Sequence, residues 1–113
     1  MIKISSLKFS LLMVAKSNEI LITDVNPYKE YTDGKPSENI AGYKYTVVCP
    51  VNKYESFSVK VRQAQPTITN EQIEAAGGSI EATFIGFEGK FYRDSRSGEY
   101  LFTAKAEEVE VIK

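Results

Sequence analysis

The chain has no histidine, one cysteine and no tryptophan among its 113 residues. Histidine is the side chain that most often transfers protons near neutral pH. Its absence excludes a Ser-His-Asp or Cys-His catalytic constellation and a zinc site built with imidazole. The lone Cys49 has no partner for an internal disulfide or a thiolate metal cluster. It lies in the apolar run of residues 45–49, so we interpret it as a small buried side chain.

Other catalytic signatures are missing as well. Glu107, Glu108 and Glu110 lie in a terminal segment without an apolar pocket that would raise the pKa of a carboxylate. The glycines do not form a phosphate-binding loop, because no glycine-rich turn is followed by a Lys-Ser/Thr pair. These absences indicate a protein that binds its target without catalysis, and they call for no cofactor and no metal.

Long apolar runs are also lacking. The apolar stretch of residues 11–14 is far too short to span a bilayer, and Lys8 interrupts the segment before it. No small-x-small cleavage site follows this stretch. We therefore expect no membrane partner and a cytoplasmic location, where an unpaired cysteine is unremarkable.

The charge is small overall but unevenly distributed. The formal net charge is −1, and residues 107–113 contain three acids and one base. Residues 42–64 contain four bases and one acid, and residues 89–106 contain four bases and two acids. Because local fields attract a phosphate backbone more than the total charge does, these two regions permit nucleic-acid binding.

Alternation of apolar and polar residues dominates the chain. An apolar fraction of 42% is enough for one core, so we expect a single domain over residues 1–113. The alternation has the period of half-buried strands. Extended segments are expected at residues 3–14, 20–25, 42–49, 55–62, 79–87, 90–93 and 99–106, with 107–113 as an acidic terminal strand or tail.

Two segments break the alternation. Residues 26–41 are polar and contain Pro27, Pro36 and the pair Asp33-Gly34, which together predict a long loop. Residues 67–78 predict the one helix, with Thr69 or Asn70 as its cap and two glycines at its end.

Three strands, a short helix and two further strands form the order of an OB-fold. We therefore expect a mainly β protein, a five-stranded OB-fold-like barrel with one short helix between strands 3 and 4. An SH3-like barrel or a small β-sandwich is the alternative, but neither explains a single helix at that point.

In an OB-fold, the outer face of the second and third strands and two adjacent loops bind the ligand. Single-stranded DNA requires cations along its phosphates and flat side chains that stack on its bases. The residues predicted to bind it lie on this face, in the first loop, at the turn between the two strands and in the last hairpin. They are Tyr28, Lys29, Tyr31, Lys35, Lys44, Lys53, Tyr54, Lys60, Arg62, Tyr92, Arg93 and Arg96.

Each group of these residues also has a structural interpretation. Lys44, Lys60 and Arg62 fit the solvated face of a half-buried sheet. Tyr28 and Tyr31 fit a loop that folds back over a barrel end. Arginines that flank a hairpin tip also discourage pairing of strand edges.

Several strings resemble a known family. They are Gly42-Tyr43-Lys44-Tyr45-Thr46-Val47-Val48, Val59-Lys60-Val61, the run of residues 84–92 and Ala104-Lys105-Ala106. They are similar to the small single-stranded-DNA-binding proteins of Gram-positive phages, in particular lactococcal phages, and of mobile elements. The resemblance implies an OB-fold protein that coats single strands in replication or recombination, acts beside other replication or recombination proteins, and forms a homo-oligomer, most often a dimer.

Two further hypotheses remain open. The near-neutral charge favours a protein-interaction or structural module of a phage or conjugative element, with tyrosines at the centre of the interface. The third hypothesis is an accessory factor that acts on a helicase or relaxase of a conjugative element.

Overall fold

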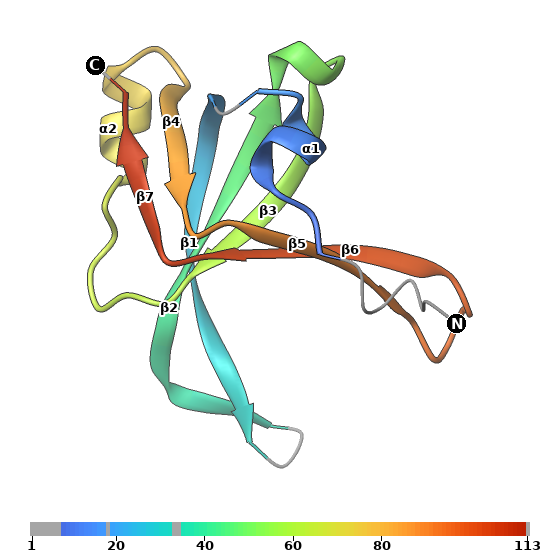
Figure 1. Ribbon diagram of the computed structural model, residues 1–113. Coiled ribbons are helices and arrows are strands. Elements are labelled where there is room, and N and C mark those ends of the chain that lie inside the picture. Colours follow the sequence, from blue (N-terminus) through green and yellow to red (C-terminus); the bar gives the residue numbers. More distant parts are fainter. Residues whose placement is uncertain (1–7, 18, 33–34, 113) are drawn as a thin grey trace.

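The computed structural model describes residues 8–17, 19–32 and 35–112 (Figure 1). The described part of the chain is mainly β, with seven strands in one sheet of order β5-β6-β3-β2-β1-β4-β7. The elements are α1 (Leu11–Ala15), β1 (Ile20–Thr32), β2 (Lys35–Cys49), the 3-10 helix η2 (Pro50–Asn52), β3 (Glu55–Val61), α2 (Asn70–Ala75), β4 (Ile80–Ile85), β5 (Glu88–Arg93), β6 (Tyr100–Ala106) and β7 (Glu108–Val111).

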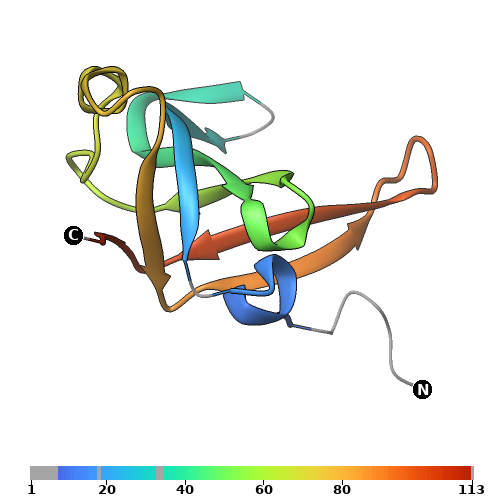
Figure 2. The same cartoon turned by 90° about the horizontal axis from the view of Figure 1, so that it is seen from above.

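The sheet curves strongly. β4 and β5 follow each other along the chain, yet β5 ends the sheet on one side while β4 lies next to its other end. Gly86, with a φ of 69°, makes the turn between them. The sheet must therefore curl, so that the short connection from β4 to β5 can reach from one end of the sheet to the other (Figure 2). Among the described residues the sheet stays open between β5 and β7, so the expected five-stranded barrel is not confirmed.

The alternation of the central strands determines which side chains are buried. Tyr45, Val47 and Cys49 of β2 and Val59 and Val61 of β3 lie in the core, as their spacing predicts. Their intervening neighbours point outward, because successive side chains of a strand face opposite sides. The side chains on the outward face of β2 and β3 therefore do not contribute to the core.

The helix between β3 and β4 is confirmed. The Thr69 hydroxyl accepts from the Gln72 backbone N–H, and the Gln72 side chain accepts in return from the Thr69 N–H. This reciprocal pair fixes where α2 begins. Gly77 and Gly78 follow with φ of 97° and 111°, which are conformations that favour glycine.

The N-terminal strand that we expected over residues 3–14 is wrong for its last part. Residues 11–15 form α1, so the described chain has two short helices instead of one. The Ser10 side chain accepts from the Met13 N–H and caps the helix. Leu11 and Ala15 are buried, one helical turn apart. In so short a segment the pattern of apolar residues fits a strand as well as a helix, so the sequence did not distinguish the two.

The long loop expected over residues 26–41 is also wrong. Apart from residues 33–34, which lie outside the described part, these residues belong to β1 and β2 and extend their hairpin. Where β1 and β2 extend past β3 and β4, the described hairpin has two strands. Pro27 and Pro36, which lack a backbone N–H, therefore need not donate a hydrogen bond to a third strand. The turn residues of the sequence therefore mark a hairpin with an irregular register.

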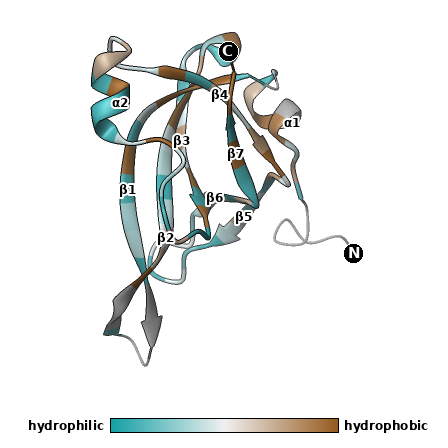
Figure 3. Cartoon of the chain, turned by 90° about the vertical axis from the view of Figure 1, so that its left-hand side faces the viewer, coloured by the Kyte–Doolittle hydropathy of each residue, from teal (hydrophilic) through white to brown (hydrophobic). Residues whose placement is uncertain are grey.

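The acidic C-terminal segment forms a strand. β7 pairs antiparallel with β4, and Val109 of β7 is buried opposite Phe84. Figure 3 shows this side of the molecule, where α2 and β7 carry hydrophilic residues. In the part of the chain that the structure describes, no helix has the length and apolar character needed to cross a membrane.

Candidate nucleic-acid interface

Three lysines form a row across three neighbouring strands. Lys44 of β2 is the register partner of Lys60 of β3, and Lys60 is the register partner of Lys105 of β6. All three face away from the core, because residues on both sides of each are buried or inward-facing. Like charges in direct cross-strand positions destabilise a sheet, so this row favours an anionic ligand that would relieve the repulsion.

On β5 the register partner of Lys105 is Glu88, and Lys90 lies two residues farther along the same side of this strand, beside a hollow. Lys60, Glu88, Lys90, Thr103, Ala104 and Lys105 line a depression of about 200 Å³. Its one carboxylate, Glu88, lies 3.8 Å from the ammonium of Lys8 and is partly neutralised there. In the described part of the chain, none of the lining lysines forms an ion pair. We call Lys44, Lys60, Lys90 and Lys105 the lysine row.

Tyr28 adds an aromatic ring to the same face. It lies opposite Gly42 in the β1–β2 register, and the Lys60 Nζ lies over its ring, 5.4 Å from the centroid. A Cβ built on Gly42 would lie 2.9 Å from Tyr28 Cε1 and would collide with the carbonyl oxygen of Val61. Glycine is therefore required here, chiefly because the backbone at Val61 and Arg62 lies too close for a Cβ, and its absence also leaves room for the Tyr28 ring.

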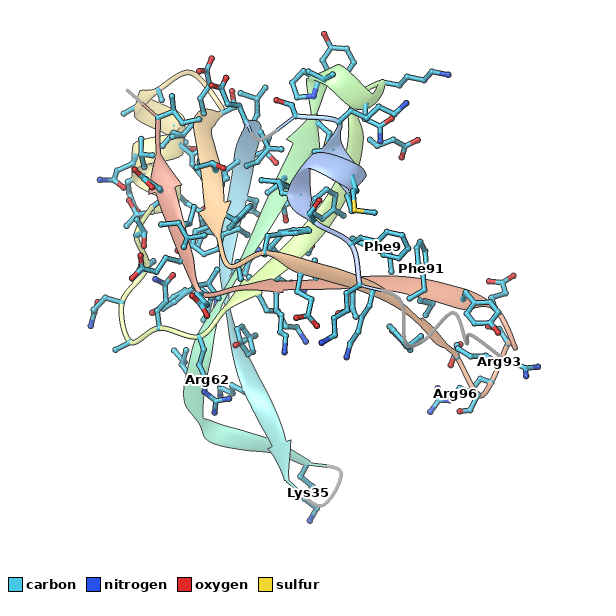
Figure 4. The ribbon with its side chains drawn as sticks, in the orientation of Figure 1. Phe9, Lys35, Arg62, Phe91, Arg93 and Arg96 are labelled. Carbon is cyan, nitrogen blue, oxygen red and sulfur yellow. The ribbon has the colours of Figure 1, made fainter. Side chains whose placement is uncertain are left out.

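Other predicted residues lie farther along the β1–β2 hairpin. Arg62 follows β3 at the base of this hairpin, and Lys35 lies near its tip (Figure 4). Lys29 is exposed on β1 between them. The side chain of Tyr31 lies outside the described residues. Because residues 26–41 contain three acids beside Lys29 and Lys35, the hairpin is not a basic extension of the lysine row.

The last hairpin diverges from this face. Tyr92 is exposed on the same side of β5 as Lys90, two residues farther out. Arg93 and Arg96 lie at the far end of the β5–β6 hairpin (Figure 4). Their predicted contact with DNA stays a prediction, since they are not part of the lysine row.

Lys53 and Tyr54 lie apart from the lysine row. They form the turn between η2 and β3, where the Tyr54 N–H donates to the Cys49 carbonyl at 2.9 Å. Both have positive φ, 55° and 60°, which is uncommon for residues with side chains. This turn lies at the end of β2 and β3 opposite to the β1–β2 hairpin tip (Figure 1).

Two residues of the interface were missed by the sequence prediction. Lys90 and Lys105 complete the row. From the sequence, only the positive charge of their region was recognised, and not their place beside Lys60. Lys105 lies between buried Ala104 and Ala106, so the alternation does predict that it faces outward. Its place beside Lys60 depends on the parallel β3–β6 pairing, which no local pattern encodes.

A second hollow lies on the opposite side of the β5–β6 hairpin. It measures about 500 Å³ and is lined by rings and by the end of β2. Phe91 and Phe102 lie there with centroids 5.2 Å apart, and Phe9 meets Phe91 edge to face. Cys49 also lines it, and burial, with a smaller contribution from Glu55, raises the pKa of the Cys49 thiol.

Comparison with protein-family models, curated proteins and solved structures finds no match for this chain. The functional argument therefore rests on the geometry of the site.

Proposed function

We propose that this protein binds single-stranded DNA without sequence preference and without catalysis. The observation that carries the proposal is the lysine row beside the Tyr28 ring on one outward face. The spacing between adjacent strands is about 4.8 Å, so neighbouring ammonium groups can serve one flexible phosphate chain. Such a groove combined with aromatic rings is the usual design for single-strand binding.

The finer fold assignment supports the same proposal. If β4 and β5 are counted as one strand interrupted at Gly86, the sheet has five long strands and the short β7, with α2 between the third and the fourth. We propose that this order corresponds to a partly open OB-fold, whose ligand face is that of the second and third strands. The lysine row begins on this face. We extend the proposal, on the sequence resemblance, to a cytoplasmic role in phage or mobile-element replication or recombination.

Fluorescence anisotropy with a labelled oligo-dT tests the proposal directly. We expect binding at low salt that weakens as salt rises, because bound phosphates release counterions. Lys60→Glu should weaken binding at least about tenfold, since it reverses a charge in the centre of the row. Lys53→Glu is the matched control, because it makes the same charge change at the other end of β3 and should alter affinity little.

Two results would overturn the proposal. One is no binding of oligo-dT at low salt, and the other is an equal loss of affinity in both lysine variants. Binding of duplex DNA as tightly as oligo-dT would argue against a single-strand binder, because exposed bases are required for stacking.

A protein-interaction module is the second candidate, and the aromatic hollow favours it. Met13 is 62% exposed at the rim of this hollow, and Tyr54 is 72% exposed on the turn before β3. Exposed apolar side chains beside a hollow are typical of protein contacts. This function predicts a stable complex that Met13→Asp disrupts and that oligo-dT leaves intact.

A further inference from the structure

Three neighbouring strands form the hollow beside the lysine row. β3 contributes Lys60, β6 contributes Thr103 and Lys105, and β5 contributes Glu88 and Lys90. In the register, Lys60 lies beside Lys105, and Lys90 lies beside Thr103. Three ammonium groups and one hydroxyl therefore surround a space of about 200 Å³, and they come from three different strands. We call this space the lysine hollow.

The lysine hollow has a positive charge. Its three lysines face one carboxylate, that of Glu88, and the ammonium of Lys8 lies 3.8 Å from this carboxylate. With Lys8 included, four ammonium groups oppose one carboxylate, a balance of +3. The site therefore attracts an anion that carries more than one charge.

The charged groups next to the hollow do not reverse this balance. Lys44 of β2 lies beside Lys60, and Arg62 follows two residues after Lys60 on the same side of β3. Glu107 follows two residues after Lys105, and the end of its side chain lies at Gly86, away from the lining residues. The nearest neighbours of the hollow thus add more positive than negative charge.

A phosphate monoester fits this site better than a phosphate within a strand. A monoester carries a charge of about −1.5 to −2 at pH 7 and has three acceptor oxygens. A phosphate within a strand carries a single charge, and two of its oxygens are esterified. The hollow offers three ammonium groups and the Thr103 hydroxyl as donors, which is enough for all three oxygens of a monoester.

We propose that the lysine hollow binds a phosphate monoester, the terminal phosphate of a nucleic-acid strand, in preference to an internal phosphate. The role of the strand rests on the proposed function, whereas the charge of the hollow does not. The Lys60 Nζ also lies over the Tyr28 ring, 5.4 Å from its centroid. An end phosphate in the hollow therefore places the first nucleotides beside this ring and along the lysine row.

Oligo-dT strands of equal length, with and without a terminal phosphate, test the proposal. The phosphate is placed at the 5′ end or at the 3′ end, and the fluorescent label is placed at the opposite end. At pH 8 we expect a terminal phosphate at one of these ends to raise the affinity at least about fivefold, because charge-assisted hydrogen bonds are added.

The pH dependence of this gain identifies the charge that causes it. The second pKa of a phosphate monoester is about 6, so the ligand loses one negative charge between pH values of about 8 and 5.5. The gain should shrink over this range, while the strand without a terminal phosphate keeps its affinity. Glu88→Gln should keep this pH effect, because the group that titrates belongs to the ligand.

Two lysine variants separate the hollow from the rest of the row. Lys90→Gln should remove most of the gain, because Lys90 lines the hollow. Lys44→Gln makes the same change of charge on the row but outside the hollow. It should weaken binding of both strands equally and leave the gain unchanged.

Equal binding of the two strands at pH 8 would overturn the proposal and leave single-strand binding intact. A gain that persists at pH 5.5, or that Lys44→Gln removes as fully as Lys90→Gln, would also contradict it. If neither strand binds, the proposed function fails, and NMR titration with inorganic phosphate at pH 8 tests the hollow alone. Shifts of the Thr103 and Lys105 amide signals that Lys90→Gln abolishes would then assign the hollow to free phosphate, and unchanged signals would refute the site.

Discussion

At the scale of single residues, Tyr45 shows how a polar group is kept in an apolar core. Its side chain is fully buried, and its hydroxyl donates to the Gln63 side chain and accepts from the Thr67 backbone N–H at 3.0 Å. These bonds hold the segment that leads from β3 to α2. The hydroxyl therefore links the core to a connection without regular structure.

Tyr45→Phe is expected to lower the free energy of unfolding by about 1–3 kcal/mol, because the Thr67 N–H and Gln63 lose a partner. Urea unfolding followed by circular dichroism measures this loss. Tyr43→Phe is the control, since Tyr43 lies on the same strand and is only partly buried. Equal stability of wild type and Tyr45→Phe would show that water replaces the lost bonds.

The burial of Cys49 predicts how the free energy of unfolding changes at alkaline pH. Burial, and secondly Glu55, raises the pKa of this thiol in the folded state. The neutral thiol is thus favoured by folding, and its contribution to stability is complete below the unfolded pKa of about 8.5. As pH rises through and above that value, the unfolded state ionises first and stability falls.

Cys49→Val removes this titration while keeping an apolar side chain of similar size. We expect the free energy of unfolding of the variant to fall less steeply than that of wild type between pH values of about 8 and 10. Urea unfolding across this range, with Cys49 kept reduced, gives both curves. Parallel curves would contradict the prediction.

At the scale of elements, Asn70 connects α2 to the sheet. Its Oδ1 accepts from the Val25 N–H at 3.0 Å and its Nδ2 donates to the Val25 carbonyl at 2.8 Å. β4 pairs with β1 only at Ile20–Ile22, so the amide of Asn70 takes the place of a strand neighbour beyond the start of β4. The helix is held at this place by two bonds to one residue.

Asn70→Ala should therefore lower the free energy of unfolding by about 1–3 kcal/mol, because two backbone groups of Val25 lose their partner. Asn70→Asp is the informative comparison, since it keeps the acceptor for the Val25 N–H and loses the donor. It should lie between wild type and alanine in urea unfolding. If alanine were as stable as wild type, the amide bonds would contribute nothing.

The sequence predicted elements where local chemistry determines them. Thr69 and the two glycines define α2, and alternation gives the inward faces of β2 and β3 correctly. The β1–β2 extension was missed because a two-stranded hairpin buries little and leaves no apolar pattern to recognise. In the candidate site, Lys44 and Lys60 were found by alternation, whereas Lys105 joins them through a pairing distant in sequence.

At the scale of the whole molecule, a net charge of −1 conceals a separation of charge. The lysine row lies on the outward face of β2, β3, β6 and β5, and three exposed glutamates, Glu81, Glu108 and Glu110, lie on β4 and β7. A neutral total keeps long-range attraction to DNA weak, while the local field at the row stays positive. The proposed binding should therefore depend on contacts at the row and hence on salt.

The salt dependence can be predicted from the number of cations. Four lysines that each neutralise one phosphate of a single strand give a slope of about −3 for log affinity against log salt. Lys105→Gln should make this slope shallower by about 0.7, because one contact is lost. Lys53→Gln, with the same change of charge at the turn before β3, should leave the slope unaltered. Anisotropy titrations with oligo-dT at several salt concentrations provide all three slopes, and a Lys53 effect equal to that of Lys105 would show that the total charge, and not the row, attracts the strand.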